Sequence, residues 1–256
     1  MDLHLTDRVF IVTGGTRGLG RATAEELVAD GARVVVSGRD QESVDRAVTA
    51  LVGTSGRDAA VGVAADNADP GTPAALVAAA RDTWGRLDGA LISVGGPPGG
   101  PVTGVSDDDW TAAFGSVFLG AVRLAREVGA ELGEEGALAF VLSTSVKQPV
   151  ENLAISNGLR PGLAMVAKSL ADELGPRGIR VNCLLPGRVA TDRVAELDAG
   201  TPDPDATRAR WEEAIPLRRY GAPAEFGRVA AFLLSPAASF VSGAMVPVDG
   251  GMTRAL

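Results

Sequence analysis

The stretch Thr13-Gly14-Gly15-Thr16-Arg17-Gly18-Leu19-Gly20 joins an apolar run that predicts a strand at 9–14 to an amphipathic pattern that predicts a helix over 19–30. Its glycines permit a tight turn and bring the backbone close to a ligand. The start of the helix offers free amide groups and the positive end of the helix dipole, which suit a pyrophosphate. The turn therefore predicts a dinucleotide site, and the alternative is a glycine-rich turn that binds nothing. The expected contacts are Gly14, Thr16, Arg17, Gly18, Leu19 and Gly20.

Outward from this turn, short apolar runs alternate with helical patterns. Continuous Val/Ile/Leu runs joined by helices predict a parallel sheet covered on both faces. No internal repeat or linker divides the chain, so the fold class is α/β: a single-domain Rossmann-like doubly wound parallel β-sheet flanked by helices on both faces, spanning 1–256. A polar, proline-containing segment at about 188–222 breaks the alternation and predicts a mobile lid. The further strands are expected at 32–38, 59–65, 89–94, 137–144 and 179–185, and the further helices at 40–52, 72–84, 107–132 and over a stretch ending near Leu174.

Composition excludes several classes of function. The net charge of −8, with no run of Lys or Arg, argues against a nucleic-acid partner. A single cysteine, Cys183, and a single histidine, His4, exclude an intramolecular disulfide and argue against a metal cluster. The first residues do not resemble a signal peptide and no apolar run reaches the length of a membrane span, so we expect no membrane partner and a cytoplasmic protein.

The end of the second predicted strand indicates which dinucleotide is bound. An acidic residue there accepts the ribose 2′-hydroxyl of NAD, whereas a cation accommodates the 2′-phosphate of NADP. Arg39 follows Ser37-Gly38, and Arg17 supplies a second guanidinium within the glycine turn. We expect NADP(H), with NAD(H) less favoured. In the alternative interpretation Arg39 is a solvated surface residue and the adjacent Asp40 is the selector.

The glycine spacing and a series of later landmarks resemble the classical short-chain dehydrogenase/reductase family, in particular its β-ketoacyl-carrier-protein reductases. The resemblance covers nearly the whole chain. The landmarks are Asp66 at the end of the third strand, Leu87-Asp88, Trp110, Ser169-Leu170-Ala171-Asp172-Glu173-Leu174, Gly178-Ile179-Arg180-Val181-Asn182, Pro186-Gly187, Thr191 and Val248-Asp249-Gly250-Gly251.

The resemblance implies roles for residues beyond the glycine turn. Asp66, with Asn67 beside it, is expected at the adenine and Gly95 at a ribose. The nicotinamide half is expected against Pro186, Gly187, Val189 and Thr191. The resemblance also implies a small-molecule carbonyl or alcohol substrate and a homodimer or homotetramer.

The departures from the family lie at its catalytic residues. The family has a catalytic tyrosine thirteen residues before the serine of its Ser-Leu-Ala pattern and a catalytic lysine four residues after the tyrosine. Counting back from Ser169 in this way, the tyrosine position falls on Ser156 and the lysine position on Arg160. The family's Asn-Asn-Ala-Gly appears as Ser93-Val94-Gly95-Gly96, and the asparagine of the long helix falls on Val117.

Two local questions stay open in the sequence. Ser143 stands thirteen residues before Ser156, which is the family spacing for the catalytic serine, but Ser145 fits the local pattern better if the loop is two residues shorter, and is preferred. Because Pro161 lacks an amide hydrogen, the helix either begins there or continues through it with a kink. Only the continuous helix places Ser156 and Arg160 one turn apart.

These replacements affect the expected chemistry. An aliphatic hydroxyl is a much weaker acid than a phenol, and an arginine stays protonated and cannot relay a proton. Lys147 and Tyr220 are further acid/base candidates, although a solvated lysine and a packing tyrosine are the simpler interpretations. We expect an NADP(H)-dependent oxidoreductase-like protein, similar to 3-oxoacyl reductases, with an atypical active site. The alternative is a noncatalytic dinucleotide-binding sensor or a partner subunit of an active homologue.

Overall fold

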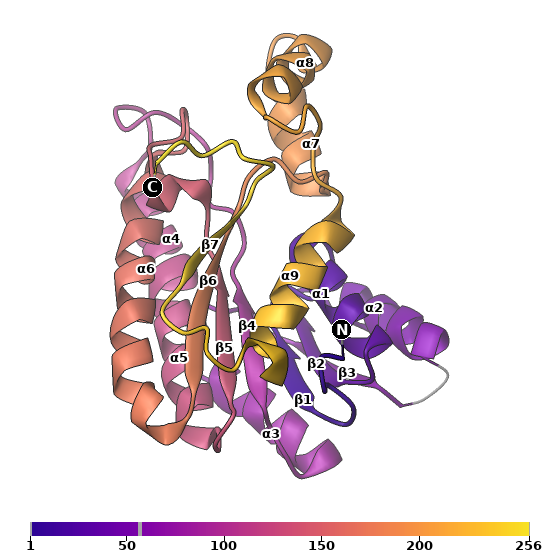
Figure 1. Cartoon of the computed structure of the whole chain (residues 1–256). Coiled ribbons are helices and arrows are strands. Elements are labelled where there is room, and N and C mark those ends of the chain that lie inside the picture. The colour runs from indigo at the N-terminus through magenta and orange to yellow at the C-terminus, as the bar shows by residue number, and fades with distance from the viewer. Residues whose placement is uncertain (1, 56–57, 256) are drawn as a thin grey trace.

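The computed structural model describes residues 2–55 and 58–255, and its centre is one seven-stranded parallel sheet in the order β3-β2-β1-β4-β5-β6-β7 (Figure 1). The order reverses between β1 and β4, which is the switch point where doubly wound sheets bind ligands. The predicted fold class is confirmed. The strands are β1 (Val9–Val12), β2 (Arg33–Gly38), β3 (Ala60–Ala64), β4 (Gly89–Ser93), β5 (Ala137–Val141), β6 (Arg180–Pro186) and β7 (Met245–Val248).

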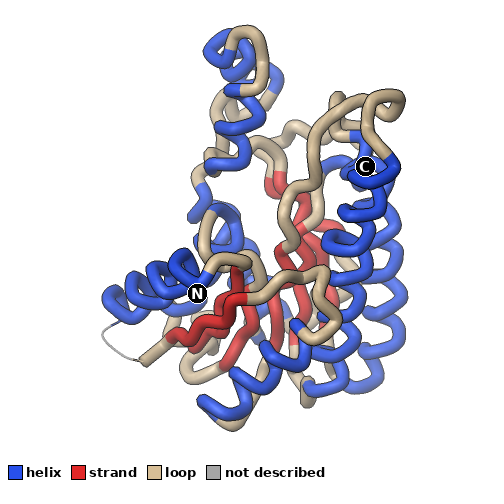
Figure 2. The backbone as a smooth tube through the Cα atoms, turned by 180° about the vertical axis from the view of Figure 1, so that it is seen from behind, coloured by secondary structure: helices blue, strands red, loops and turns tan. Residues whose placement is uncertain are grey.

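Alternate residues of β1 divide the core into two layers because successive side chains of a strand point to opposite faces. Val9 and Ile11 pack with the helices over 72–84, 120–131 and 154–174, whereas Phe10 and Val12 pack with those over 18–29, 41–55 and 223–234. Figure 2 shows the helices on both sides of the strands. The covering helices are α1 (Gly18–Ala29), α2 (Gln41–Ser55), α3 (Thr72–Trp84), α5 (Gly120–Glu131), α6 (Ala154–Leu174) and α9 (Pro223–Leu234), and the short 3₁₀ turns are η2 (Thr144–Val146), η3 (Gly175–Arg177) and η4 (Pro236–Ala238).

The long helix expected over 107–132 differs from the prediction in its middle. It begins as expected, because the Ser106 hydroxyl accepts a hydrogen bond from the amide of Asp109 and caps α4 (Asp107–Ala113). Six residues of π-helix, η1 (Phe114–Leu119), then separate α4 from α5. Ser116 and Val117 of this wider segment face the ligand cavity described below.

Helix α6 settles the question left open by Pro161. The helix starts at Ala154 and runs through the proline without a break. The side-chain amide of Asn157 secures this start by donating to and accepting from the backbone of Val150, at 2.8 and 2.9 Å. Ser156 and Arg160 therefore lie one turn apart on α6, and both are buried.

The segment from 188 to 222 contains two helices that the sequence pattern did not indicate, α7 (Asp192–Ala199) and α8 (Pro204–Ala214). Both helices project from the sheet at the top of Figure 1. The two ends of the segment meet, since Ala190 donates to the Gly221 carbonyl at 2.8 Å and Gly221 donates to the Arg188 carbonyl at 2.9 Å. Within the described ranges, no helix has both the length and the apolar character needed to cross a membrane.

Candidate functional site

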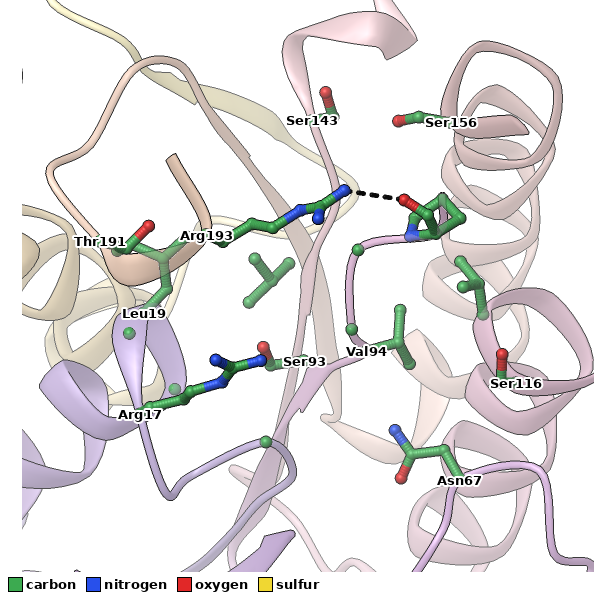
Figure 3. Close-up of a pocket in the computed structure, with 18 of the residues that line it drawn as sticks. Arg17, Leu19, Asn67, Ser93, Val94, Ser116, Ser143, Ser156, Thr191 and Arg193 are labelled. Atoms are coloured by element: carbon green, nitrogen blue, oxygen red, sulfur yellow. Dashed lines mark hydrogen bonds between the residues drawn. The ribbon is translucent and has the colours of Figure 1, made fainter. Parts of the chain in front are cut away.

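A cavity of about 590 Å³ lies at the carboxyl ends of the strands, over the switch point between β1 and β4. It extends from the glycine turn after β1 to the start of α6, and α7 forms one of its walls (Figure 3). The position is the one that open α/β sheets use for dinucleotides and their reaction partners.

The glycine turn has the geometry that a phosphate requires. Gly14 and Gly18 have φ of 60° and 58°, values that L side chains rarely adopt. A Cβ on Gly20 would lie 2.3 Å from the carbonyl oxygen of Gly14, so only glycine fits there. Arg17 precedes α1 with an extended backbone and no side-chain cap, which leaves the first amides of α1 without a side-chain acceptor. All six residues predicted for this turn line the cavity: Gly14, Thr16, Arg17, Gly18, Leu19 and Gly20.

In the next part of the cavity, the lining residues are Arg39, Arg17, Asp66 and Asn67. Asp40 is not among the described lining residues. Its carboxylate accepts a hydrogen bond from the Ser43 amide at 2.8 Å, and the hydrogen bonds from Ser43 lower the pKa of Asp40. The acid that competed with Arg39 as selector is therefore used at the start of α2. The described residues therefore fit a dinucleotide, and Arg17 and Arg39 make the end of the cavity expected for its adenosine cationic.

At the opposite end, Ser156 points from α6 toward Ser143, and both line the cavity (Figure 3). Ser145 does not appear on the described wall. Its hydroxyl lies 3.1 Å from that of Ser156, and its amide donates to the Ser143 hydroxyl at 3.1 Å. The structure thus places Ser143 at the cavity and Ser145 behind it, opposite to the preference that the local sequence pattern gave. The turn η2 is the reason, because it carries the chain away from the cavity after Ser143.

Arg160 closes this end of the cavity. It is 6% exposed and donates from Nη1 to the carbonyl oxygen of Val141 at 2.8 Å. Burial lowers its pKa to about 10, because the charged form loses hydration. The side chain therefore still carries its charge at neutral pH.

Neither of the other acid/base candidates lines the cavity. The Tyr220 hydroxyl is buried and donates to Asp198 at 2.9 Å, and burial together with this hydrogen bond raises the pKa of Tyr220 to about 12. Lys147 is half-buried at the end of η2. Among the described lining residues there is no histidine, cysteine, tyrosine or lysine. Cys183 is buried in β6, where burial raises its pKa to about 12.

The residues predicted for the nicotinamide half are also on the wall, and the sequence missed a neighbour of theirs. Gly95, Pro186, Gly187, Val189 and Thr191 all line the cavity. Arg193 of α7 reaches across it and donates from Nη2 to the carbonyl oxygen of Pro97 at 2.9 Å (Figure 3). No sequence signal indicated Arg193, because the lid pattern gave no helix and no inward face. The described residues contain no cluster of three or more His, Cys, Asp or Glu suited to a metal.

Comparison with known proteins agrees with this geometry. Residues 14–253 match the sequence model of the family described as "Enoyl-(Acyl carrier protein) reductase". Dehydrogenase/reductase SDR family member 2, mitochondrial, from Homo sapiens is 34% identical, over 98% of this chain and 88% of its own length. Levodione reductase from Leifsonia aquatica is 32% identical, over 98% of this chain and 96% of its own length. The solved structure of L-sorbose reductase from Gluconobacter frateurii, complexed with NADPH and L-sorbose, superposes with a TM-score of 0.91 at 29% identity, covering 100% of both chains.

Proposed function

Because the chain belongs to the classical short-chain dehydrogenase/reductase family of oxidoreductases, we propose that it binds NADP(H) and transfers hydride to or from a carbonyl or alcohol substrate at an active site of altered composition. The observation that carries the proposal is the uncapped start of α1, which lines the cavity beside a turn whose backbone requires glycine at position 20 and favours glycine at positions 14 and 18. A 3-oxoacyl-like substrate is the first class to test.

Successive residues along the cavity suit successive parts of the dinucleotide. Arg17 and Arg39 suit the 2′-phosphate, the first amides of α1 suit the pyrophosphate, and Asp66 with Asn67 suits the adenine. Gly95, Pro186, Gly187, Val189 and Thr191 suit the nicotinamide half. When bound, the dinucleotide would supply or accept hydride at its nicotinamide ring.

The chain's own hydroxyls and its buried cation have separate roles at the substrate end. Ser143 faces the cavity and can donate a hydrogen bond to a substrate oxygen. The Ser156 hydroxyl is hydrogen-bonded to that of Ser145, which fixes its orientation. Arg160 supplies a fixed positive charge but no proton. We assign the proton transfer to water, since the described wall holds no histidine, cysteine, tyrosine or lysine.

Exchange of Arg39 tests the cofactor preference. Arg39→Ala is expected to weaken NADPH binding about tenfold and leave NADH binding unchanged, because only the phosphorylated cofactor loses a charge-assisted hydrogen bond. Titration calorimetry measures both dissociation constants. The matched control is Arg46→Ala, an exposed arginine of α2 that pairs with Glu42 away from the cavity. Tighter binding of NADH than of NADPH by the unaltered protein would refute the preference.

A second candidate function is a dinucleotide-binding sensor or a partner subunit without turnover. It is favoured by one observation, the absence of any tyrosine, lysine, histidine or cysteine from the described wall of the cavity. Anaerobic mixing with NADPH and a panel of ketones separates the two. If NADPH binds but no ketone of the panel causes its oxidation, the sensor function is supported and the enzymatic function is refuted.

We also propose that residues 188–222 form a lid that behaves as one unit. The buried carboxylate of Asp198 accepts hydrogen bonds from Arg188 at 2.8 Å and from Tyr220 at 2.9 Å, joining α7 to both ends of the segment. The Arg188 guanidinium in turn lies 4.2 Å over the Trp211 ring of α8. The residues that this unit contributes to the cavity wall are Val189, Thr191, Asp192, Arg193, Val194, Glu196 and Leu197.

Removal of the shared carboxylate is expected to loosen the lid alone. Asp198→Ala leaves the Tyr220 hydroxyl and the Arg188 guanidinium without their acceptor, and we expect about tenfold faster cleavage of the lid in limited proteolysis. The midpoint of global thermal unfolding should change little, because the sheet does not contact Asp198 through these bonds. Asp205→Ala, at an exposed acid of α8, is the control. Equal cleavage of the two variants would contradict the lid's being held together at Asp198.

Two large apolar side chains on the surface bear on the assembly state. The side chains of Met165 on α6 and Phe114 on η1 are exposed, which supports a homodimer or homotetramer formed through this side of the molecule. A cytoplasmic location stays a prediction of the sequence.

A further inference from the structure

Arg160 is a buried charge without an acidic partner. Its single hydrogen bond runs to the Val141 carbonyl, and none of the ion pairs formed by the described residues includes it. Burying a guanidinium is costly unless a charge or several hydrogen bonds compensate it. By contrast, Arg180, the other buried arginine of the described chain, donates to the carbonyls of Leu233, Leu234 and Ser235. Arg160 therefore has binding capacity that the protein alone does not use.

The unused donors of Arg160 open into the cavity. The residue is part of the cavity wall, and the one buried side-chain atom left without a partner in the described structure is the Thr253 hydroxyl. Thus the remaining N–H groups of Arg160 are not sealed inside the core. Ser156 lies one turn earlier on α6. Ser143 lies just past the end of β5, two residues after Val141, whose carbonyl accepts the Arg160 hydrogen bond. The guanidinium and both hydroxyls face the same end of the cavity.

The acids on the wall do not compensate this cation. The Glu196 carboxylate lies 3.5 Å from the Arg17 guanidinium of the glycine turn and 3.7 Å from the Arg193 guanidinium of α7, so it already faces two cations. Asp109 accepts the Ser106 hydroxyl at 2.7 Å at the start of α4. A neutral hydroxyl from a ribose supplies hydrogen bonds to a guanidinium but no negative charge. A planar, delocalised oxyanion supplies both, because it matches the fork of the guanidinium.

We propose that Arg160 and Ser143 form a binding site for a delocalised oxyanion of the substrate, such as a carboxylate or an enolate. The proposal deepens the proposed function, on which it rests for the identity of the cavity as an active site. A permanent cation can hold such a charge without a proton, whereas an alkoxide needs one. Ser156 and Arg160, which stand at the family's tyrosine and lysine positions, then favour ligands that stay negatively charged when bound.

The test compares acidic and neutral ligands of the same shape by titration calorimetry on the protein saturated with NADP⁺. Levulinate is expected to bind at least about tenfold more tightly than methyl levulinate, because it alone offers a charged acceptor. Arg160→Gln should abolish this difference, and Arg160→Lys should keep most of it. Arg210→Gln, an exposed lid arginine away from the cavity, is the matched control and should keep all of it.

A second probe distinguishes an enolate from a carboxylate. Para-nitrophenol imitates an enolate, and its visible absorbance reports whether it binds as the phenolate. Preferential binding of the phenolate that depends on Arg160 identifies enolate-like ligands as the source, and preference for levulinate alone identifies carboxylates. If neither probe shows a charge preference that depends on Arg160, the proposal is overturned.

Two further outcomes are decisive. If Arg160→Gln weakens NADP⁺ binding and leaves the preference for levulinate over its ester intact, Arg160 holds the cofactor and the oxyanion site is wrong. If the unaltered protein binds no NADP⁺, the proposed function fails, while the comparison of acid with ester on the ligand-free protein still tests the oxyanion site. Arg160→Lys keeps the charge at the buried position, so the test stands even where Arg160→Gln does not fold.

Discussion

Replacing Ser156 by tyrosine together with Arg160 by lysine is expected to raise the rate of ketone reduction by at least about 100-fold. The continuous helix α6 places the two positions one turn apart on the cavity wall, so the new phenol and ammonium groups would be neighbours. A nearby cation lowers the pKa of a phenol toward neutrality, which makes it an effective proton donor. Oxidation of NADPH with a panel of ketones, followed by absorbance, measures the gain.

The matched control for this gain is the pair Ser156→Phe and Arg160→Lys. Phenylalanine fills nearly the same space as tyrosine but offers no hydroxyl. Ketone reduction should stay at the starting level in this control. Levulinate binding should fall in both doubly altered proteins if the ring at position 156 covers the cation at position 160. Equal rates for the tyrosine and phenylalanine variants would show that proton supply is not what limits the protein.

The second large effect concerns the glycine turn. Gly20→Val is expected to weaken NADPH binding by about 100-fold, because its Cβ would lie 2.3 Å from the Gly14 carbonyl oxygen and 2.8 Å from its carbon. The turn must open to relieve this contact, which moves the first amides of α1 away from the phosphate. Gly53→Ala in α2 is the control, since a Cβ there meets no atom within 4 Å, and it should leave binding unchanged.

Folding and binding defects are separable in this experiment. Thermal unfolding reports whether the Gly20→Val protein keeps its sheet. Gly18→Ala provides a milder change, because the nearest atom to its Cβ is 3.6 Å away on Thr191 and only the φ of 58° is unfavourable. Retention of full NADPH affinity by Gly20→Val would mean that the turn does not hold the pyrophosphate.

The sheet and the dinucleotide end were predictable because they depend on local patterns. The unbroken apolar run of β1 indicates a strand covered on both faces, and the glycines that follow it indicate a turn. The parallel pairing of β1 with both β2 and β4 is the arrangement expected at the centre of a doubly wound sheet. The positions of Arg17 and Arg39 on the cavity wall follow from the same topology.

The substrate end was less predictable because non-local contacts decide it. A π-helical stretch shifts the facing of Ser116 and Val117 without changing the hydrophobic pattern. The inward position of Ser143 depends on where β5 gives way to η2, and spacing alone left Ser143 and Ser145 both open. Arg193 faces the cavity only because tertiary contacts fold the lid back over it.

The closed base of the lid has a consequence for how this protein can diverge. Two backbone hydrogen bonds join the beginning of the segment 188–222, at Arg188 and Ala190, to its end at Gly221. The residues between them therefore leave the body of the protein and return to it at one place. Loop-closure entropy grows slowly with length, so such an excursion can be shortened, extended or grafted from a relative at small cost to the sheet. The part of the cavity wall that this segment supplies can therefore be exchanged, by evolution or by design, while the sheet and the glycine turn stay constant.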